Sequence, residues 1–344
     1  MSLFFDEIHE QPQALRRLLE AEVVSIRQVA QAIRRRAPRF VVMAARGSSD
    51  NAARYGQYLF GARNRLPVAL ATPSLFTLYK TPPRLKDALV LAISQSGQSP
   101  DICAVVDEGR RQGAMTVAVT NDPESPLAAL AEACIHLHAG PERAIAASKT
   151  YTASLLALAM LSCALEDDLP SRSLNRVPGA AKRTLQHAQT VLSAAAAYAQ
   201  ADACVTIGRG YNYATAFEIA LKLKELAYLL AEPYSSADFQ HGPVALVQDG
   251  FLVIAVVPAG RVAAELTRFL EGLRQRGARL VVIASHPRPL ALAHTPIPLP
   301  AGLPEWLSPI TAVISGQLFA LGLTQARGLD PDRPRGLSKI TRTR

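Results

Sequence analysis

The chain has 344 residues, which suggests about two domains, and 49% of them are hydrophobic while only 19% are charged. This composition is typical of a packed globular protein and excludes a largely disordered one. The net charge is +9, but the arginines are scattered and no basic stripe is interleaved with aromatic residues. We therefore expect neither a nucleic-acid partner nor a membrane partner, and a small anionic substrate accounts equally well for the positive charge.

The N-terminal segment, 1–30, is expected to be helical, and it has acidic residues and no long apolar run. It therefore does not resemble a secretory signal. The four cysteines lie far apart and form no CxxC pair, which is typical of reduced thiols. These features predict a cytoplasmic protein.

Three apolar, β-branched runs follow, at 40–44, 88–93 and 116–119. Helical stretches follow the first two runs, at 50–60 and 100–112. Runs that are apolar on both faces are typical of strands in a parallel sheet that helices cover on both sides.

The same pattern then appears a second time. Apolar runs at 203–208, 251–256 and 280–283 match the first three in order, and Ala203 and Phe251 lie 163 residues after Phe40 and Ala88. Another helical stretch, 262–276, lies between the last two runs. A repeat of this length is a domain used twice.

The sequence therefore predicts an α/β fold of two tandem domains, each a doubly wound parallel sheet in a three-layer αβα arrangement. The expected division is an N-terminal helical segment (1–30), a first domain (31–180), a second domain (181–330) and a C-terminal tail (331–344).

Polar side chains follow the strands at the edge where open α/β sheets bind ligands. The first strand is followed by Gly47-Ser48-Ser49, and the third by Ser94-Gln95-Ser96-Gly97-Gln98-Ser99-Pro100. Serine hydroxyls beside a helix N-terminus are suited to phosphate, although serines also serve simply as helix caps. A nucleotide P-loop and a complete GxGxxG motif are both absent, so a dinucleotide site is not expected.

No group of His and Cys residues has the spacing of a metal site. His136 and His138 flank Leu137 on an expected strand, and we interpret them as structural or surface residues.

A charged helical stretch, Glu218–Leu226, stands out in the second repeat. Helical spacing places Lys222 on one face with both Glu218 and Glu225, which fits either a surface ion pair or a catalytic group. It precedes the segment Glu232–Pro243, which we expect to be a long irregular loop without a counterpart in the first repeat. His241 lies in this loop, and histidine titrates near neutral pH.

Taken together, these motifs resemble the double sugar-isomerase (SIS) domain. The motifs are the two serine turns, the Leu-Lys-Leu-Lys-Glu helix, the His-Gly-Pro loop and a tail of the form Asp-x-Pro-x-Gly-Leu-x-Lys that ends at Lys339. The resemblance implies that the phosphate and sugar hydroxyls are held by Ser49, Ser94, Gln95, Ser96 and Ser99. It also implies backbone contacts from Ile145 and Ser338.

The resemblance also implies the catalytic roles. Glu225 would move a proton between C1 and C2 of the sugar, with Lys222 supporting it. His241 would assist ring opening from the neighbouring subunit of a homodimer, and Lys339 would lie near the carbonyl. Neither a metal nor a cofactor is expected for this chemistry.

The implied reaction is the conversion of glucosamine 6-phosphate into fructose 6-phosphate and ammonia. Residue 2 is Ser2 and the first cysteine is Cys103, so a glutaminase with an N-terminal cysteine is not expected and deamination is the simpler direction. Three related activities stay open: the isomerase component of an aminotransferase, a fructosamine-6-phosphate deglycase and a galactosamine-6-phosphate deaminase. A sugar-phosphate sensor is the non-enzymatic alternative.

Overall fold

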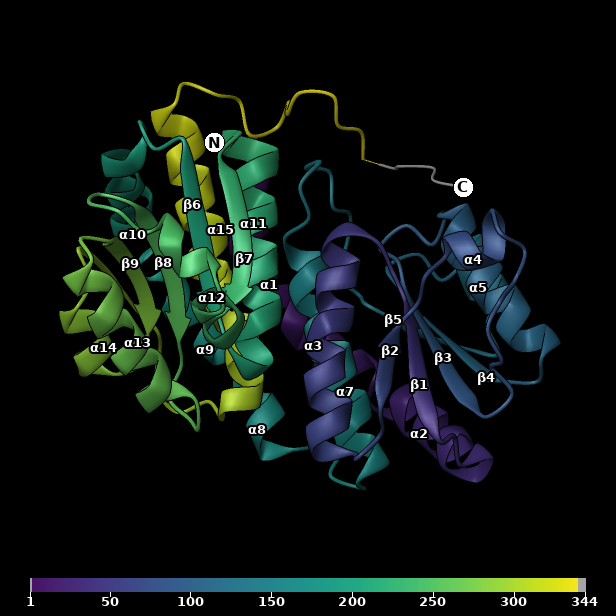
Figure 1. Cartoon of the computed structure of the whole chain (residues 1–344). Coiled ribbons are helices and arrows are strands. Elements are labelled where there is room, and N and C mark those ends of the chain that lie inside the picture. The colour runs from purple at the N-terminus through teal and green to yellow at the C-terminus, as the bar shows by residue number, and fades with distance from the viewer. Residues whose placement is uncertain (1, 340–344) are drawn as a thin grey trace. The chain divides into compact units, whose positions relative to one another are not determined.

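A computed structural model describes residues 2–339, and these residues form two compact units (Figure 1). One unit comprises residues 13–142 and 149–175 together with Ser338 and Lys339. The other comprises residues 2–12, 143–148 and 176–337. Each unit contains one five-stranded sheet in which every strand pair is parallel, so the predicted α/β class is confirmed.

The sheet of the first unit has the strand order β2-β1-β3-β4-β5. The strands are β1 (Phe40–Ala44), β2 (Val68–Leu70), β3 (Ala88–Ile93), β4 (Met115–Thr120) and β5 (Ala133–His136). Every residue of β3 and β4 is buried, as expected for central strands that are covered on both faces.

Helices cover both faces of this sheet. The described helices of the unit are the C-terminal part of α1 (Leu3–Ala21), then α2 (Val23–Arg36), α3 (Gly47–Arg63), α4 (Ser74–Thr77), α5 (Pro100–Arg111), α6 (Pro126–Leu130), α7 (Lys149–Leu165) and α8 (Arg172–Asn175). One apolar core joins the sheet to α4, α5 and α6 through side chains such as Phe76, Val105 and Leu127. On the other face α7 packs against α2 and α3, and α7 is buried along almost its whole length.

The sheet of the second unit has the strand order β10-β9-β8-β6-β7. Its strands are β6 (Ala203–Gly208), β7 (Leu230–Ser235), β8 (Leu252–Val257), β9 (Arg279–Ala284) and β10 (Thr295–Pro298). Its helices are the start of α1, then α9 (Val177–Leu185), α10 (Ala188–Ala195), α11 (Tyr213–Ala227), α12 (Ser236–Gln240), α13 (Ala263–Gln275), α14 (Pro287–Ala291) and α15 (Ser308–Ala326). Single 3₁₀ turns lie at η1 (Ala196–Tyr198), η2 (Gly210–Asn212), η3 (Pro243–Leu246) and η4 (Glu305–Leu307).

The helix α15 is the core helix of the second unit. Residues Glu305–Ala326 are long and apolar enough to cross a membrane by length and composition, but their apolar window is entirely buried in the fold. The helix packs against α9, α10 and α11, which places it on the face of the sheet opposite α13. Its apolar character is thus used by the packing of this unit.

The duplication that the sequence predicts is present in the strand register. Val42 of β1 lies opposite Val90 of β3, and Val205 of β6 lies opposite Val253 of β8. Each residue of the second pair follows its counterpart by 163 residues, so the two sheets repeat both the order and the alignment of their strands.

The expectation of a long irregular loop at Glu232–Pro243 is wrong. Residues 230–235 form the edge strand β7, which is followed by α12 and the 3₁₀ turn η3. The polar composition and Pro233 disguise the strand, because an edge strand tolerates proline and exposes alternate side chains. The first repeat has its counterpart in β2 and α4, so the segment is shared by both domains.

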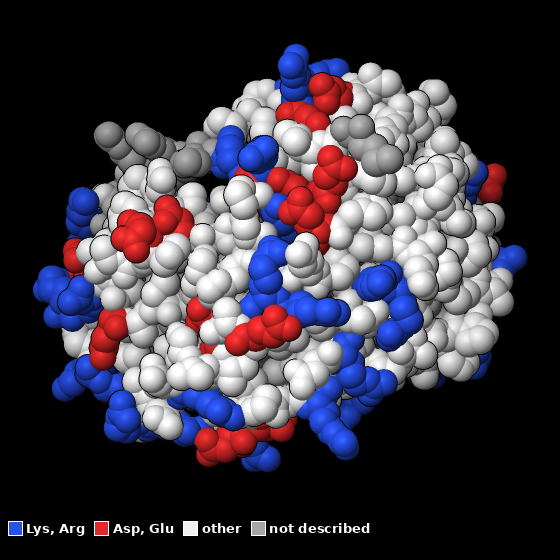
Figure 2. Space-filling model, turned by 180° about the vertical axis from the view of Figure 1, so that it is seen from behind, with Lys and Arg blue, Asp and Glu red and all other residues white. Residues whose placement is uncertain are grey.

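Charges of both signs are spread over the surface. Figure 2 shows Lys and Arg side chains interspersed with Asp and Glu over the face that it presents. Several of these charges form exposed ion pairs, such as Arg36 with Glu132 and Arg288 with Glu271. Such pairs contribute little to stability, about 0–1 kcal/mol each.

Candidate functional site

A serine-rich turn leads from β3 into α5 in the first unit. The Ser94 hydroxyl is buried and accepts a hydrogen bond from the Gly97 N–H at 3.1 Å, and the Ser96 hydroxyl accepts one from Gln98 at 3.3 Å. The carbonyl of Gln95 accepts a hydrogen bond from the backbone N–H of Asn121 at 3.1 Å, which joins the turn to the end of β4. The turn is therefore held in shape by its own side chains and by the neighbouring strand.

Gly97 is required at the centre of this turn. Its φ is +60°, and a Cβ at this position would overlap the side chain of Ser125. Its carbonyl in turn accepts a hydrogen bond from Leu127 at 3.1 Å. Only glycine combines this backbone conformation with so close an approach.

The turn ends at Ser99, which occupies the N-cap of α5 in the usual extended conformation but makes no side-chain capping bond. Ser125, the N-cap of α6, does make such a bond, to the N–H of Ala128 at 3.4 Å. The partly exposed hydroxyl of Ser99 is thus available beside the positive end of a twelve-residue helix. Ser49, also partly exposed, lies in the first turn of α3. Such groups can bind an anion.

An arginine follows the first strand in each unit, and both arginines pair with an acid on a later helix. Arg46 Nε lies 2.8 Å from Asp101 Oδ2, and Arg209 Nη1 lies 3.2 Å from Glu265 Oε1. Asp101 is fully buried, whereas about half of the Arg46 side chain is exposed. The sequence analysis treated Arg46 only as the end of a repeated strand. Its conserved offset from Arg209 within the duplication was the signal that could have identified the pair.

The second unit contains a buried ionic triad on α11. Lys222 Nζ lies 2.6 Å from Glu225 Oε2 and 3.4 Å from Glu218 Oε1, as the spacings i, i+3 and i, i+4 predict. Lys222 and Glu218 are buried, while 23% of the Glu225 side chain is exposed. Burial alone would lower the pKa of Lys222, but the two carboxylates outweigh it and the pKa is raised. The lysine is therefore a fixed cation, and Glu225 is the acid that solvent can reach.

His241 follows α12 and is exposed. Its backbone N–H donates to the Asp238 carbonyl at 3.1 Å, and Gly242 beside it has a φ of +133°. The imidazole therefore lies on a short turn at the surface of this unit, and no printed contact joins it to Glu225 in the same unit.

The tail brings Lys339 to a buried acid in the first unit. Lys339 Nζ lies 3.0 Å from Glu142 Oε2, and the Glu142 side chain has no exposed surface. Glu142 also accepts hydrogen bonds from the Thr150 N–H at 3.1 Å and from its hydroxyl at 2.7 Å. Ser338 beside it is exposed. Sequence reasoning missed Glu142, because 197 residues separate it from the lysine that it binds.

Ile145 lies in the short segment 143–148, which belongs to the second unit and is partly exposed at this residue. The carboxylate of Glu7 holds the start of this segment by accepting hydrogen bonds from the backbone N–H groups of Arg143 at 2.5 Å and Ala144 at 3.4 Å. The segment is thus shaped by a buried acid of α1.

The expected site residues therefore fall into separate groups. Ser94, Gln95, Ser96 and Ser99 share one turn, and Ser49 and Lys339 belong to the same unit as that turn. The other unit holds Lys222 and Glu225, which form an ion pair, together with His241 and Ile145.

Comparison with known proteins identifies the family. A model of the SIS domain matches residues 35–164 and again residues 197–324. The chain belongs to the SIS-domain family. The two matches coincide with the two parallel sheets, so this double SIS protein has one domain for each half of the duplication.

Related sequences and structures extend over almost the whole chain. This SIS protein is 34% identical, over 97% of its length, to a glutamine–fructose-6-phosphate aminotransferase (isomerizing) of Thermococcus kodakarensis, and 35% identical to that of Symbiobacterium thermophilum. It spans only 56–58% of the length of these relatives.

Solved structures show the same fold. A protein of Silicibacter pomeroyi that is provisionally described as a phosphosugar isomerase superposes with a TM-score of 0.87 at 35% identity, covering 96% of this chain and 100% of that one. A glucosamine-6-phosphate deaminase of Thermotoga maritima superposes with a TM-score of 0.82 at 22% identity, covering 99% and 100%. The second likeness concerns the fold alone.

Proposed function

We propose that this chain is a phosphosugar isomerase that deaminates glucosamine 6-phosphate to fructose 6-phosphate and ammonia. The observation that carries the proposal is the triad on α11, in which a buried lysine is held between two carboxylates and only Glu225 reaches solvent. The identity to proteins described as phosphosugar isomerases and isomerizing aminotransferases supports the class of substrate.

The proposed mechanism needs one mobile proton. Ring opening, assisted by His241, exposes an aldehyde that acidifies the hydrogen on C2. Glu225 removes this hydrogen to give an enolamine and returns it to C1, and water then hydrolyses the C2 imine to a ketone and ammonia. Lys339 would stabilise negative charge on the carbonyl oxygen.

The phosphate would be held by the serine turn. Ser99 has a hydroxyl that its helix does not use, and the N–H groups at the start of α5 favour an anion. Ser49, Ser94, Gln95 and Ser96 would complete the contacts to phosphate and sugar hydroxyls, with backbone groups of Ile145 and Ser338. None of these steps assigns a task to a cofactor.

The deciding experiment follows ammonia and fructose 6-phosphate after purified protein is mixed with glucosamine 6-phosphate. We expect both products in equal amounts and a loss of about 10²–10⁴-fold in kcat for Glu225→Gln, which keeps the shape of the side chain. Glu232→Gln, an exposed position on β7, is the matched control. Absence of ammonia with the wild type, or full activity of Glu225→Gln, would reject the proposal.

A second function is favoured by the aminotransferase relatives. The chain could serve as an isomerase component that forms glucosamine 6-phosphate from fructose 6-phosphate, with ammonia supplied by a separate glutaminase. Net synthesis that depends on an added glutaminase, without deamination, would select this function. Comparison with galactosamine 6-phosphate and with a fructosamine 6-phosphate would separate the related deaminase and deglycase activities. Binding of sugar phosphates without turnover would indicate a sensor.

We further propose a homodimer in which His241 serves the site of the neighbouring subunit, which the exposure of His241 supports. Glu225→Gln and His241→Asn should each be inactive. Mixed in equal amounts and allowed to exchange subunits, they should recover about a quarter of wild-type activity, because half of the dimers contain one intact site. No recovery despite proven exchange would place His241 in its own subunit's site.

A further inference from the structure

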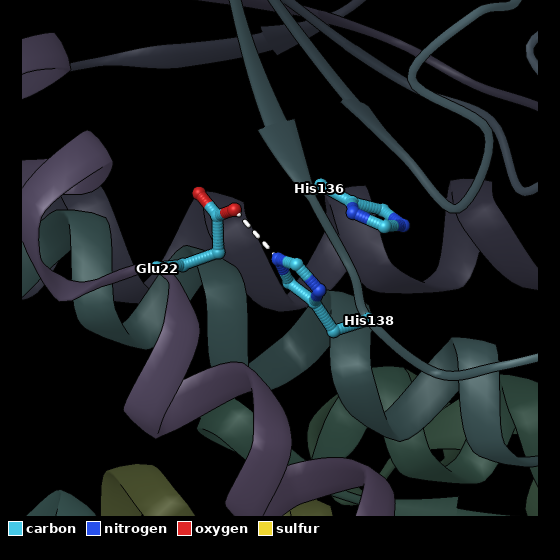
Figure 3. Close-up of side chains that lie close together, drawn as sticks. All are labelled: Glu22, His136 and His138. Atoms are coloured by element: carbon cyan, nitrogen blue, oxygen red, sulfur yellow. Dashed lines mark hydrogen bonds and ion pairs between the residues drawn. The ribbon is translucent and has the colours of Figure 1, made fainter.

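Three potential metal ligands meet in the first unit, away from the residues assigned to the sugar. Glu22, His136 and His138 each offer one ligand atom, and these atoms all lie within 4.8 Å of one another (Figure 3). His138 Nε2 lies 2.8 Å from Glu22 Oε1, and the centres of the two imidazole rings are 3.9 Å apart. The group combines two nitrogen donors with one oxygen donor.

The fold holds each of these side chains from a different direction. His136 ends strand β5, and His138 follows it with a φ of +48°. Arg17 of α1 fixes this bend by donating to the carbonyls of His138 and Ala139, each at 3.1 Å. Glu22 lies between α1 and α2 and makes no side-chain capping bond to α2. Its carboxylate is therefore directed to the histidines and not to the helix.

The carboxylate of Glu22 is buried without full satisfaction. The residue is only 8% exposed, and within residues 2–339 its Oε2 has no hydrogen-bond partner. A buried carboxylate oxygen without a partner is costly, by several kcal/mol for an ion in a dry site. An incoming cation would satisfy this oxygen, whereas the bond from His138 occupies only Oε1.

We propose that Glu22, His136 and His138 bind a divalent transition-metal ion of the Zn²⁺ type. Two imidazoles and one carboxylate are a donor set that suits Zn²⁺ and does not suit Mg²⁺ or Ca²⁺, which take oxygen ligands. Tetrahedral zinc with ligands at about 2.0–2.1 Å places neighbouring ligand atoms roughly 3.3 Å apart. The atoms are already close to this spacing, so rotation of the side chains is sufficient to complete the site.

The proposed ion has a fourth position open to solvent, because 28% of the His138 side chain is exposed. By joining the loop between α1 and α2 to the end of β5, it would stabilise this unit through mass action. The proposal is independent of the sugar chemistry, since none of the three ligands belongs to the residues assigned to it.

The test is metal binding by the purified full chain after treatment with a chelator. Zn²⁺ is titrated against a chromophoric competitor, and Co²⁺ is followed by its visible absorption, which is intense for four-coordinate and weak for six-coordinate ions. The variants are His136→Gln with His138→Gln, and separately Glu22→Gln. His187→Gln, an exposed histidine of the other unit, is the control.

We expect one Zn²⁺ per chain, an intense Co²⁺ spectrum, and at least about a 100-fold weaker affinity for the double histidine variant. The melting temperature should rise with added Zn²⁺ in the wild type and in His187→Gln only. Circular dichroism confirms that each variant is folded before titration. Equal stoichiometry and affinity in the double variant, or no Zn²⁺ bound by the wild type, would show that the cluster is only a hydrogen-bonded Glu–His group.

Discussion

Lys222 Nζ lies 2.6 Å from Glu225 Oε2, and this ion pair joins a fully buried cation to a carboxylate that solvent reaches. The same ammonium lies 3.4 Å from the buried Glu218. One lysine therefore neutralises a structural acid and orients the proposed catalytic one. Stability and activity should consequently depend on the same side chain.

Replacing Lys222 with methionine should lower both. The substitution leaves Glu218 buried without its counter-charge, which we expect to cost about 3–5 kcal/mol in the free energy of unfolding. Glu225 also loses the group that orients it, so deamination should fall. Urea unfolding and the ammonia assay measure the two effects. Lys224→Met, at an exposed position of the same helix, should change stability by less than about 0.5 kcal/mol. Equal unfolding midpoints for the two variants would contradict the assigned role of the triad.

Two N-cap serines should respond in opposite ways to alanine. Ser125 caps α6, so Ser125→Ala should lower the free energy of unfolding by about 1 kcal/mol. Ser99 makes no capping bond, so Ser99→Ala should leave stability unchanged. It should instead raise KM for the phosphorylated sugar roughly tenfold through loss of a hydrogen bond to a charged group. A stability loss in Ser99→Ala with an unchanged KM would show that the serine serves only as a cap.

Much of the fold follows from the sequence because its signals are local. Buried central strands such as 88–93 are uniformly apolar, and the repeat at 163 residues reveals both domains. The helical spacing of Lys222 and Glu225 likewise predicts their ion pair, which the structure confirms. The edge strand β7 escaped prediction because its exposure and its proline make it similar to a loop.

The remaining site features depend on contacts between residues that are distant along the chain. Glu142 meets Lys339 from 197 residues away, and Glu22 meets His138 from 116 residues away. No spacing rule within a segment reports such pairs, because only the folded sheet brings them together. Arg46 and Asp101 are separated by 55 residues and were missed for the same reason.

Gly97 offers a test of the turn geometry. In Gly97→Ala the new Cβ would overlap Ser125 in a left-handed backbone conformation, so both strain and a clash oppose folding. Gly113→Ala has a similar φ of +79° but meets no atom within 4 Å, so only the backbone strain remains, about 1–2 kcal/mol. Thermal unfolding should show the larger loss for Gly97→Ala, and only this variant should also raise KM. Equal losses would mean that the turn can relax around the extra methyl group.

Cys204 should make the protein sensitive to alkaline pH. Burial raises the pKa of this thiol from 9.0 to about 12, so the folded state keeps a proton that the unfolded state releases. Stability is therefore present below pH 9 and falls as the pH rises towards 12, by about 1.4 kcal/mol per pH unit. Urea unfolding of wild type and Cys204→Ala between pH 8 and 10.5 isolates this effect, because other titrating groups are common to both. The stability difference between them should narrow by about 2 kcal/mol over that range. A constant difference would show that the thiol does not titrate on unfolding.

The ion pair between Lys339 and Glu142 should couple the tail to activity. Glu142 is buried and holds Lys339 at 3.0 Å, so Glu142→Gln removes the charge that positions this lysine. We expect Glu142→Gln and Lys339→Met each to lower kcat/KM, and the double variant to be little worse than Lys339→Met alone. The coupling energy should lie within about 0.5–3 kcal/mol. Glu166→Gln, which loosens only the more exposed pair with Arg63, should leave kcat/KM unchanged. Additive losses in the double variant would mean that Glu142 acts on another part of the unit, and that the tail reaches its place without it.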